Sequence, residues 1–233
     1  MDFPPNTTAF DADIITTKAH PELAAAGFDT IFRYIAIATR DPDKVVKPAE
    51  AKSMQAHGLK LALIYESTAE RVLSGAAGGK ADGAFSASYA PSVGVPPGIG
   101  AAIYPTADFD LQLSQLATAM SYLRAFAAAC PGYDLGFYAN GLANDEAFSQ
   151  GIIKYRWITQ SMGFTGTRSS LEAGRYEIVQ RLPTKVCGLD VDPDSLREPG
   201  LEIGARVPFA VPVAAKPESI VQRAEDWVLG KKA

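Results

Sequence analysis

Residues 101–129, AAIYPTADFDLQLSQLATAMSYLRAFAAA, decide the fold predicted for this chain. The stretch opens with a short apolar run from Ala101 to Thr106, which is typical of a buried strand. It closes with Leu, Met, Tyr and Phe at helical spacing from Leu111 to Ala129, which predicts a long helix. Asp108 and Asp110 lie between the two elements. A strand that ends in polar residues and leads into a helix is the repeating unit of an α/β barrel.

The same alternation of strand and helix extends over most of the chain. Short β-rich runs bounded by turn residues predict strands, and runs of helical period predict helices. The predicted strands are residues 9–15, 30–37, 60–65, 101–106, 134–138, 155–159, 176–180 and 187–191. The predicted helices are residues 21–26, 48–58, 80–90, 111–129 and 142–150. This order predicts a parallel TIM-type (β/α)8 barrel in which the helices after strands 6 and 7 are weak or missing.

The whole chain, residues 1–233, is interpreted as one domain. α/β barrels use this length as a single unit, and a composition of 47% hydrophobic and 21% charged residues builds a large core. A C-terminal extension, residues 199–233, starts with a proline-rich part that lacks helical periodicity. A closing helix is predicted at its end because five apolar residues share one helical face, namely Ile220, Val221, Ala224, Trp227 and Val228.

Charge and terminal sequence exclude several classes of partner. The formal net charge is −4, the pI is about 5.3 and the basic residues are scattered, so no nucleic-acid partner is expected. The first residues lack the regions of a signal peptide, and no apolar run approaches the ~20 residues of a spanning helix. We expect a protein that is made soluble, is a monomer and has no membrane partner. Delivery to a cell wall would then need a phage or a secretion system.

Carboxylates follow four of the predicted strands. They are Asp11 and Asp13 at strand 1, Glu66 at strand 3, Asp108 and Asp110 at strand 4, and Asp190 and Asp192 at strand 8. Residues two apart on a strand point to the same side, with about 6.5 Å between their Cα atoms, so each Asp-x-Asp pair can face one pocket. Crowded carboxylates repel, which keeps one protonated as an acid while another stays ionised. Hydrolysis of a glycosidic bond needs this division.

Aromatic, amide and guanidinium side chains at the strand ends predict a sugar-binding rim. Sugar rings stack on aromatic faces through their C–H groups, and sugar hydroxyls bond to amides and carboxylates. Packing in the core is the alternative for each aromatic residue. The predicted substrate-binding residues are Asp13, Arg33, Tyr65, Tyr138, Gln180, Asp190 and Asp192.

Other interpretations of these residues stay open. An Asp at a strand end also caps the next helix or turn, so Asp110 is a candidate N-cap and Asp192-Pro193-Asp194 a candidate turn. The Asp cluster alone can ligate a hard cation such as Mg²⁺ or Ca²⁺, although we expect neither a metal nor a cofactor. Residues 75–80, GAAGGK, are one residue short of a phosphate loop and are interpreted as a flexible loop. No serine elbow occurs and neither histidine ends a strand, which disfavours a catalytic triad.

The order of the motifs resembles a known family. In chain order they are Phe10-Asp11, Phe32-Arg33-Tyr34-Ile35, Ile64-Tyr65-Glu66, Ile103-Tyr104, Asp108-Phe109-Asp110, Gly136-Phe137-Tyr138, Val179-Gln180 and Asp190-Val191-Asp192. Over residues 8–194 the chain resembles the glycoside-hydrolase-like domain formerly called domain of unknown function 1906, a relative of the family 25 lysozymes. The resemblance implies a TIM-type barrel that cleaves peptidoglycan beside N-acetylmuramic acid.

The resemblance also implies roles for single residues. Family 25 lysozymes use an Asp-x-Glu pair after strand 4 with the Glu as proton donor, whereas the matching residues here are Asp108 and Asp110. Asp11 matches the first-strand Asp of the lysozymes. The leading hypothesis is a muramidase-like hydrolase whose acid is Asp108 or Glu66. Its base or electrostatic partner is then Asp11, Asp13 or Asp110.

Two further functions stay open. A glycan-binding barrel that lost turnover when the Glu became Asp would keep the same pocket. A metal-dependent phosphoesterase would instead use the Asp residues as ligands of a cation. Carboxylate geometry distinguishes the hydrolase from the glycan-binding barrel, because a glycosidase needs two carboxyl groups at a defined separation across the scissile bond.

Overall fold

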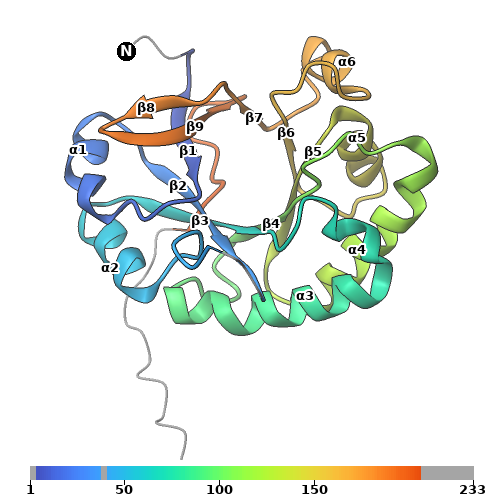
Figure 1. Cartoon of the computed structure of the whole chain (residues 1–233), viewed down its shortest axis with the longest axis horizontal. Helices are drawn as coiled ribbons and strands as arrows, with labels where there is room; N and C mark the ends of the chain where they lie inside the picture. Colours follow the sequence, from blue (N-terminus) through green and yellow to red (C-terminus); the bar gives the residue numbers. More distant parts are fainter. Residues whose placement is uncertain (1–3, 38–40, 206–233) are drawn as a thin grey trace, which may run out of the picture.

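The computed structural model describes residues 4–37 and 41–205. The strands are β1 (Thr7–Ala12), β2 (Thr30–Ile35), β3 (Lys60–Tyr65), β4 (Ala102–Pro105), β5 (Asp134–Ala139), β6 (Tyr155–Ile158), β7 (Ile178–Gln180), β8 (Thr184–Val186) and β9 (Leu189–Leu196). The α-helices are α1 (His20–Ala25), α2 (Pro48–Ala56), α3 (Gly75–Tyr89), α4 (Leu116–Ala129), α5 (Gly141–Ser149) and α6 (Thr167–Glu172). Short 3-10 helices are η1 (Thr17–Ala19), η2 (Arg71–Ser74), η3 (Ala90–Val93) and η4 (Leu113–Gln115). Figure 1 shows the strands at the centre and the helices around them.

The strands close into a barrel. β1 to β7 pair in chain order, and β9 lies between β7 and β1, so that the described residues form a complete ring. Neighbouring strands from β1 to β7 are all parallel. The predicted TIM-type barrel is confirmed. Its functional face is the one formed by the carboxyl ends of the parallel strands.

The last barrel strand runs opposite to the predicted direction. β8 leads into β9 through a tight turn at Cys187 and Gly188, which both have positive φ angles of 47° and 80°. A two-residue turn of this kind makes an antiparallel hairpin, whereas another parallel strand would have needed a crossover helix. The interpretation of Asp192-Pro193-Asp194 as a turn is also wrong, because these residues pair with β1 inside β9.

The reversal of β9 keeps its carboxylates at the functional face. Asp192 is the register partner of Asp11, and Asp194 is the partner of Ala9. Because β9 enters the barrel from the carboxyl-end face, the first residues that it pairs with β1 lie level with the end of β1. Asp192 therefore reaches the place predicted for it, although from a strand that starts there.

Alternate residues of the strands fill the inside of the barrel. The ring of Tyr104 lies against Gly136, where a Cβ would come within 2.1 Å of the ring, so only glycine fits. The Tyr104 hydroxyl donates to the backbone oxygen of Ile203 over 2.9 Å. Trp157 and Tyr138 pack edge to face, with ring centroids 5.0 Å apart. The large members of the cluster are Phe32, Ile64, Tyr104, Tyr138, Tyr155 and Trp157.

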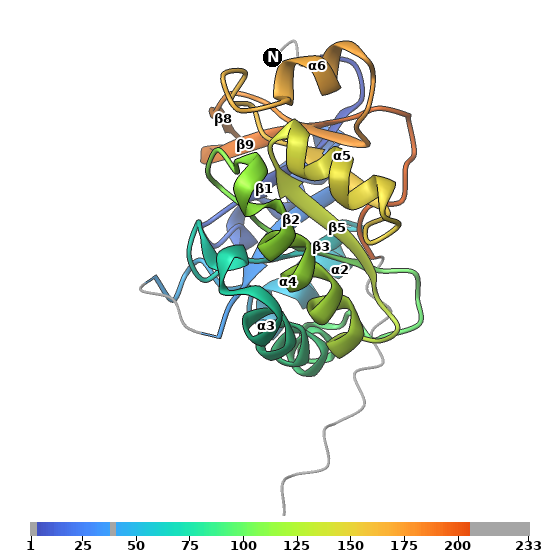
Figure 2. The ribbon, with the colours of Figure 1, turned by 90° about the vertical axis from the view of Figure 1, so that its right-hand side faces the viewer.

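Helices α3 and α4 pack side by side on the outside of the barrel (Figure 2). The interpretation of residues 75–80 as a flexible loop is wrong, because α3 begins at Gly75. A Cβ at Gly79 would lie 2.1 Å from the backbone oxygen of Tyr122, and one at Gly83 would lie 2.4 Å from that of Phe126. The glycines therefore permit a close approach of two helix backbones.

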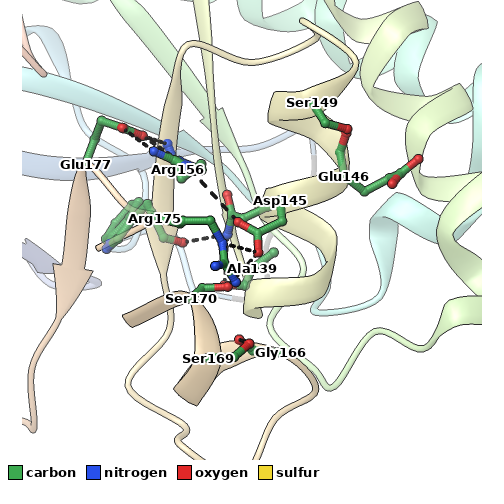
Figure 3. A network of polar contacts seen from close by, with 12 residues as sticks. Ala139, Asp145, Glu146, Ser149, Arg156, Gly166, Ser169, Ser170, Arg175 and Glu177 are labelled. Atoms are coloured by element: carbon green, nitrogen blue, oxygen red, sulfur yellow. Dashed lines mark hydrogen bonds and ion pairs between the residues drawn. The ribbon is translucent and has the colours of Figure 1, made fainter. Parts of the chain in front are cut away.

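A network of charged side chains joins α5, β6 and α6 (Figure 3). Asp145 accepts hydrogen bonds from Arg175 over 3.0 Å and from Ser170 over 2.8 Å. Arg156 binds both carboxylate oxygens of Glu177 at 2.8 and 3.1 Å. Arg156 also lies 4.0 Å from Asp145, which links the two halves. The network holds the part of the barrel where α6 is short and where no helix follows β7 in the described residues, as predicted.

Two sequence predictions concern the ends of helices. The predicted closing helix at residues 220–228 lies outside the described residues. The helix predicted from Leu111 begins at Leu116, because η4 precedes it. Within residues 4–37 and 41–205, no helix has the length and apolar character needed to cross a membrane.

Replacing Gly79 by Ala should destabilise the protein. Alanine favours a helix by about 1 kcal/mol over glycine, but its Cβ has no room beside Tyr122, and overpacking costs about 1–3 kcal/mol. We expect a net loss of about 1–2 kcal/mol in the free energy of unfolding, measured by urea denaturation. Gly163→Ala is the matched control, because no atom lies within 4 Å of its added Cβ. Equal stability of the two variants would contradict the packing argument.

Candidate active site

A polar cavity opens at the carboxyl-end face of the barrel. Its inner part has a volume of about 150 Å³ and is lined by Asp11, Tyr34, Ile64, Glu66, Thr106, Asp108, Tyr138, Trp157, Gln160, Gln180 and Asp192. The adjoining outer part, of about 310 Å³, adds Ala12, Asp13, Lys44, Pro183, Asp190 and Val191. The outer part alone is large enough to fall at the lower end of the range for small-molecule sites. Barrel closure thus brings together carboxylates that are far apart in sequence.

Asp11 forms part of the cavity floor, with only 4% of the residue exposed. Its Oδ1 accepts a hydrogen bond from the Tyr34 hydroxyl over 3.2 Å, and its Oδ2 accepts one from Nε2 of Gln180 over 2.8 Å. The same nitrogen lies 3.4 Å from Oδ2 of Asp192, so one amide bridges two carboxylates. Tyr138 fixes that amide by donating its hydroxyl to Oε1 of Gln180 over 2.7 Å.

The bridged carboxyl groups do not titrate like free ones. Burial, and then the charge of Asp192, raise the pKa of Asp11 to about 8. Burial and the charges of Asp13 and Asp108 also raise the pKa of Asp192. The two groups interact because they are register partners on neighbouring strands, so removing a second proton is costly. Asp11 is therefore the member that holds a proton at neutral pH.

Asp194 lies one layer below this pair. The residue is fully buried, and its Oδ1 accepts a hydrogen bond from Nε1 of Trp157 over 2.8 Å. Burial and the charge of Asp11 hold the pKa of Asp194 well above its usual range. Asp194 was not among the predicted site residues. Its position two residues after Asp192 was the available signal, because such residues share one face of a strand.

Glu66 lies on the cavity wall directly after β3. Lys44 donates to its Oε1 over 2.5 Å, and the Thr106 hydroxyl donates to its Oε2 over 3.2 Å. The Lys44 ammonium also lies 4.2 Å from the centre of the Tyr34 ring. Lys44 comes from the segment between β2 and α2, where no periodic pattern pointed to a site. The ion pair therefore holds Glu66 in place at the cavity wall.

Asp108 lines both the inner and the outer part of the cavity and is accessible to solvent there. It follows β4, and its backbone nitrogen donates to the carbonyl oxygen of Ala69 over 3.2 Å. Partial burial of the carboxyl group and the charge of Glu66 raise its pKa. Asp108 thus combines access to a ligand with an increased tendency to keep its proton.

Asp110, the second member of the Asp-x-Asp pair, does not line the cavity. Its Oδ1 accepts from the backbone nitrogen of Thr165 over 2.6 Å and from Nδ2 of Asn140 over 2.9 Å. Its Oδ2 accepts from Gln112 over 2.8 Å and from the Thr165 hydroxyl over 3.2 Å. Desolvation opposes ionisation, but these bonds prevail and lower the pKa of Asp110. Asp110 is not the N-cap of α4 either, because Gln112 caps η4 in front of that helix.

Arg33 and Tyr65, two predicted substrate contacts, face away from the cavity. Arg33 is fully buried, pairs with Glu50 of α2 over 2.9 Å and donates to the backbone oxygen of Ala12. Tyr65 packs against Phe85 of α3, with ring centroids 6.2 Å apart. Their strand neighbours Tyr34 and Glu66 line the cavity instead. Side chains alternate along a strand, so each pair of neighbours sends one side chain inward and the other outward.

Asp13 and Asp190 lie at the mouth of the cavity, in its outer part. The carboxylate of Asp190 is exposed and pairs with Lys185 over 2.8 Å. Lys44 is the one cationic side chain among the described lining residues, against six carboxylates. No group of three or more His, Cys, Asp and Glu side chains in the described ranges is arranged to hold a metal ion.

The profile of the Rv2525c-like, glycoside hydrolase-like domain matches residues 21–184. The chain belongs to this family. The resemblance predicted from the order of the motifs is thereby confirmed. No curated protein matches the chain.

Members and neighbours of the Rv2525c-like family share the fold. The Tat-secreted protein Rv2525c of Mycobacterium tuberculosis is 22% identical, with a TM-score of 0.70 over 85% of this chain and 98% of that one. The glycosyl hydrolase 25 GHIP of Streptococcus pneumoniae is 14% identical, with a TM-score of 0.52 over 81% and 86% of the two chains. The catalytic domain of endolysin ply40 from bacteriophage P40 of Listeria monocytogenes is 12% identical, with a TM-score of 0.52 over 81% and 91%. At these identities the likeness shows the fold alone.

The family match leaves two of the four carboxylates of the inner cavity outside its range. Asp11 precedes residue 21 and Asp192 follows residue 184. Pairing of β1 with β9 brings both into the cavity with Asp108, which lies inside the matched range. The candidate site of this Rv2525c-like domain is therefore completed by the first and last barrel strands.

Replacing Asp11 by Asn should stabilise the protein, and the gain should increase with pH. The folded state keeps Asp11 protonated up to about pH 8, whereas an unfolded Asp loses its proton near pH 4. Wild-type stability therefore falls through this window by up to about 1.4 kcal/mol per pH unit, a loss that Asn does not share. Urea unfolding near pH 5 and near pH 7.5 measures the difference.

The control for this experiment is Glu198→Gln. Glu198 is exposed and lies beyond the end of β9, at the other end of the barrel from the cavity. A difference between Asp11→Asn and wild type that stays constant with pH would contradict a protonated Asp11.

Proposed function

We propose that the protein is a muramidase-like hydrolase that cleaves glycosidic bonds of peptidoglycan. The observation that carries the proposal is that Asp11, Glu66, Asp108 and Asp192 line a single cavity at the functional face of the barrel. The pKa of Asp11, of Asp108 and of Asp192 is raised by burial and by neighbouring charge. A glycosidase needs one carboxyl group that keeps its proton beside one that is ionised, and this cavity supports both states.

Asp108 is the proposed proton donor. It is accessible in the cavity, so its carboxyl group can approach a glycosidic oxygen, and its raised pKa favours the protonated form. Glu66 is the second candidate acid. Its two oxygens already accept bonds from Lys44 and Thr106, which makes it the less free of the two to donate a proton.

The bridged pair of Asp11 and Asp192 is the proposed electrostatic partner. Asp11 keeps its proton near neutrality, and we assign the ionised role to Asp192, the less buried member of the pair. An ionised carboxylate stabilises the positive charge that develops at the anomeric carbon, or it activates the attacking group. Tyr138 and Gln180 line the inner cavity as contacts for sugar hydroxyls, and Asp13 and Asp190 do so at its mouth.

Structural neighbours support the same class of reaction. One neighbour is a glycosyl hydrolase 25 and another is the catalytic domain of an endolysin. We propose peptidoglycan as the substrate on this basis. Delivery by a phage or a secretion system is part of the same proposal.

One observation favours a glycan-binding module without turnover. Asp110 stands where the related lysozymes carry their acid Glu, and it is saturated by hydrogen bonds outside the cavity. A protein that keeps the cavity but lacks this acid would bind a glycan and leave it intact. Activity measurements on purified wall glycan distinguish the two functions.

Replacing Asp108 by Asn should abolish most of the release of reducing sugars from purified peptidoglycan. Loss of a general acid lowers the rate by about 10²- to 10⁴-fold, and we expect a loss within that range. Asp192→Asn should have a comparable effect, whereas Glu66→Gln should retain more activity because Glu66 is held by Lys44. Glu198→Gln, at the other end of the barrel, should leave the rate unchanged.

Melting temperatures of all variants establish that the comparison concerns folded proteins. Full activity in folded Asp108→Asn would remove Asp108 from the mechanism. If the wild type binds glycan but cleaves none of several wall types, the glycan-binding module becomes the proposed function instead of the hydrolase.

A further inference from the structure

The cavity wall offers many hydrogen-bond acceptors and few free donors. The side-chain donors that line it are largely used on acceptors of the same wall. Asp11 accepts from Tyr34 and Gln180, and Gln180 also donates to Asp192. Glu66 accepts from Lys44 and Thr106. Tyr138 donates to Gln180, and Trp157 donates to Asp194 below the cavity. A ligand rich in hydrogen-bond donors therefore matches this wall better than one rich in acceptors.

The acceptors of the wall are not all satisfied by the protein. A carboxylate accepts up to about four hydrogen bonds, so Asp108 and Asp192, which line the inner cavity, have capacity left. A ligand rich in N–H or O–H groups can use this capacity.

The charge of the inner cavity also favours a ligand that carries a positive charge. The inner cavity holds Asp11, Glu66, Asp108 and Asp192, and the one lysine of the lining is already paired with Glu66 over 2.5 Å. Burial, and then the charges of neighbouring carboxylates, raise the pKa of Asp11, Asp108 and Asp192. A bound cation would relieve the repulsion between these charges, whereas an anionic group would increase it.

We propose that the cavity prefers glycans that carry a free primary amine, with the ammonium group bound among Asp11, Asp108 and Asp192. This inference concerns the ligand of the proposed hydrolase site and rests on that assignment of the cavity. An ammonium supplies three donors and a positive charge, which the described lining offers only in Lys44, already paired with Glu66. An N-acetyl group in the same place brings a carbonyl acceptor and a methyl group instead.

The ammonium has two possible sources in a wall polymer. One is the 2-amino group of a hexosamine without its acetyl group, and the other is the side-chain amine of a wall peptide. The chemistry that the cavity recognises is the same in both. Separate probes for the sugar amine and the peptide amine identify the source.

Isothermal titration with defined probes tests the preference. The probes are a glucosamine tetramer, the matching N-acetylglucosamine tetramer and a lysine-containing wall peptide. We expect at least one amine probe to bind the wild type about tenfold or more tightly than the N-acetylated tetramer, with an affinity that falls as salt increases. Asp192→Asn and Asp108→Asn should remove this preference.

The control is Glu198→Gln, which changes the net charge by the same amount at the other end of the barrel and should keep the preference. Equal binding of aminated and acetylated probes by the wild type would overturn the inference, and so would a preference that Glu198→Gln removes as strongly as Asp192→Asn. Cleavage of peptidoglycan without any amine preference would leave the proposed function intact and reject this inference. Amine-selective binding without cleavage would support this inference and reject the proposed hydrolase function.

Discussion

The antiparallel insertion of β9 between β7 and β1 is the constraint on which the rest of the structure depends. It closes the ring of strands, and its register sets Asp192 beside Asp11 at the functional face. A parallel eighth strand would have presented its last residues there, and a different pair of carboxylates would face the cavity. The tight turn at Cys187 and Gly188 therefore controls the composition of the site.

Bringing these carboxylates together has an energetic cost that the wall partly offsets. The amide of Gln180 donates to both Asp11 and Asp192, and Tyr138 holds that amide in the orientation that this requires. Burial, and then the charge of Asp192, remain as the causes of the raised pKa of the Asp11 carboxyl. Carboxyl groups with a shifted pKa in a cavity are typical of functional sites, because catalysis needs acids and bases whose pKa values match the reaction. The fold thus gives up some stability at the face that carries the candidate site.

Much of the architecture was predictable from local patterns. The predicted limits of β3 agree with the structure, and Pro48 begins α2 as a first-turn proline should. Carboxylates after strands 1, 3 and 4 were placed at the correct face, because every parallel strand in such a barrel ends on that side. Asp192 reaches the same face for another reason, because β9 is antiparallel and begins there. The glycines of α3 were misread as a loop, because their packing role depends on a partner helix that is distant in sequence.

The sequence by itself determined the order of the seven parallel strands and of most helices, the acidic strand ends and the family, but not α6 or the hairpin of β8 and β9. Only the tertiary structure decided which of these side chains meet. Asp108 enters the cavity while Asp110 is held by Thr165 and Asn140, and Glu66 enters while its neighbour Tyr65 packs outside. Local patterns reveal that neighbouring residues alternate, but barrel closure and strand register fix which alternate set faces inward, and these depend on contacts between segments far apart in the chain.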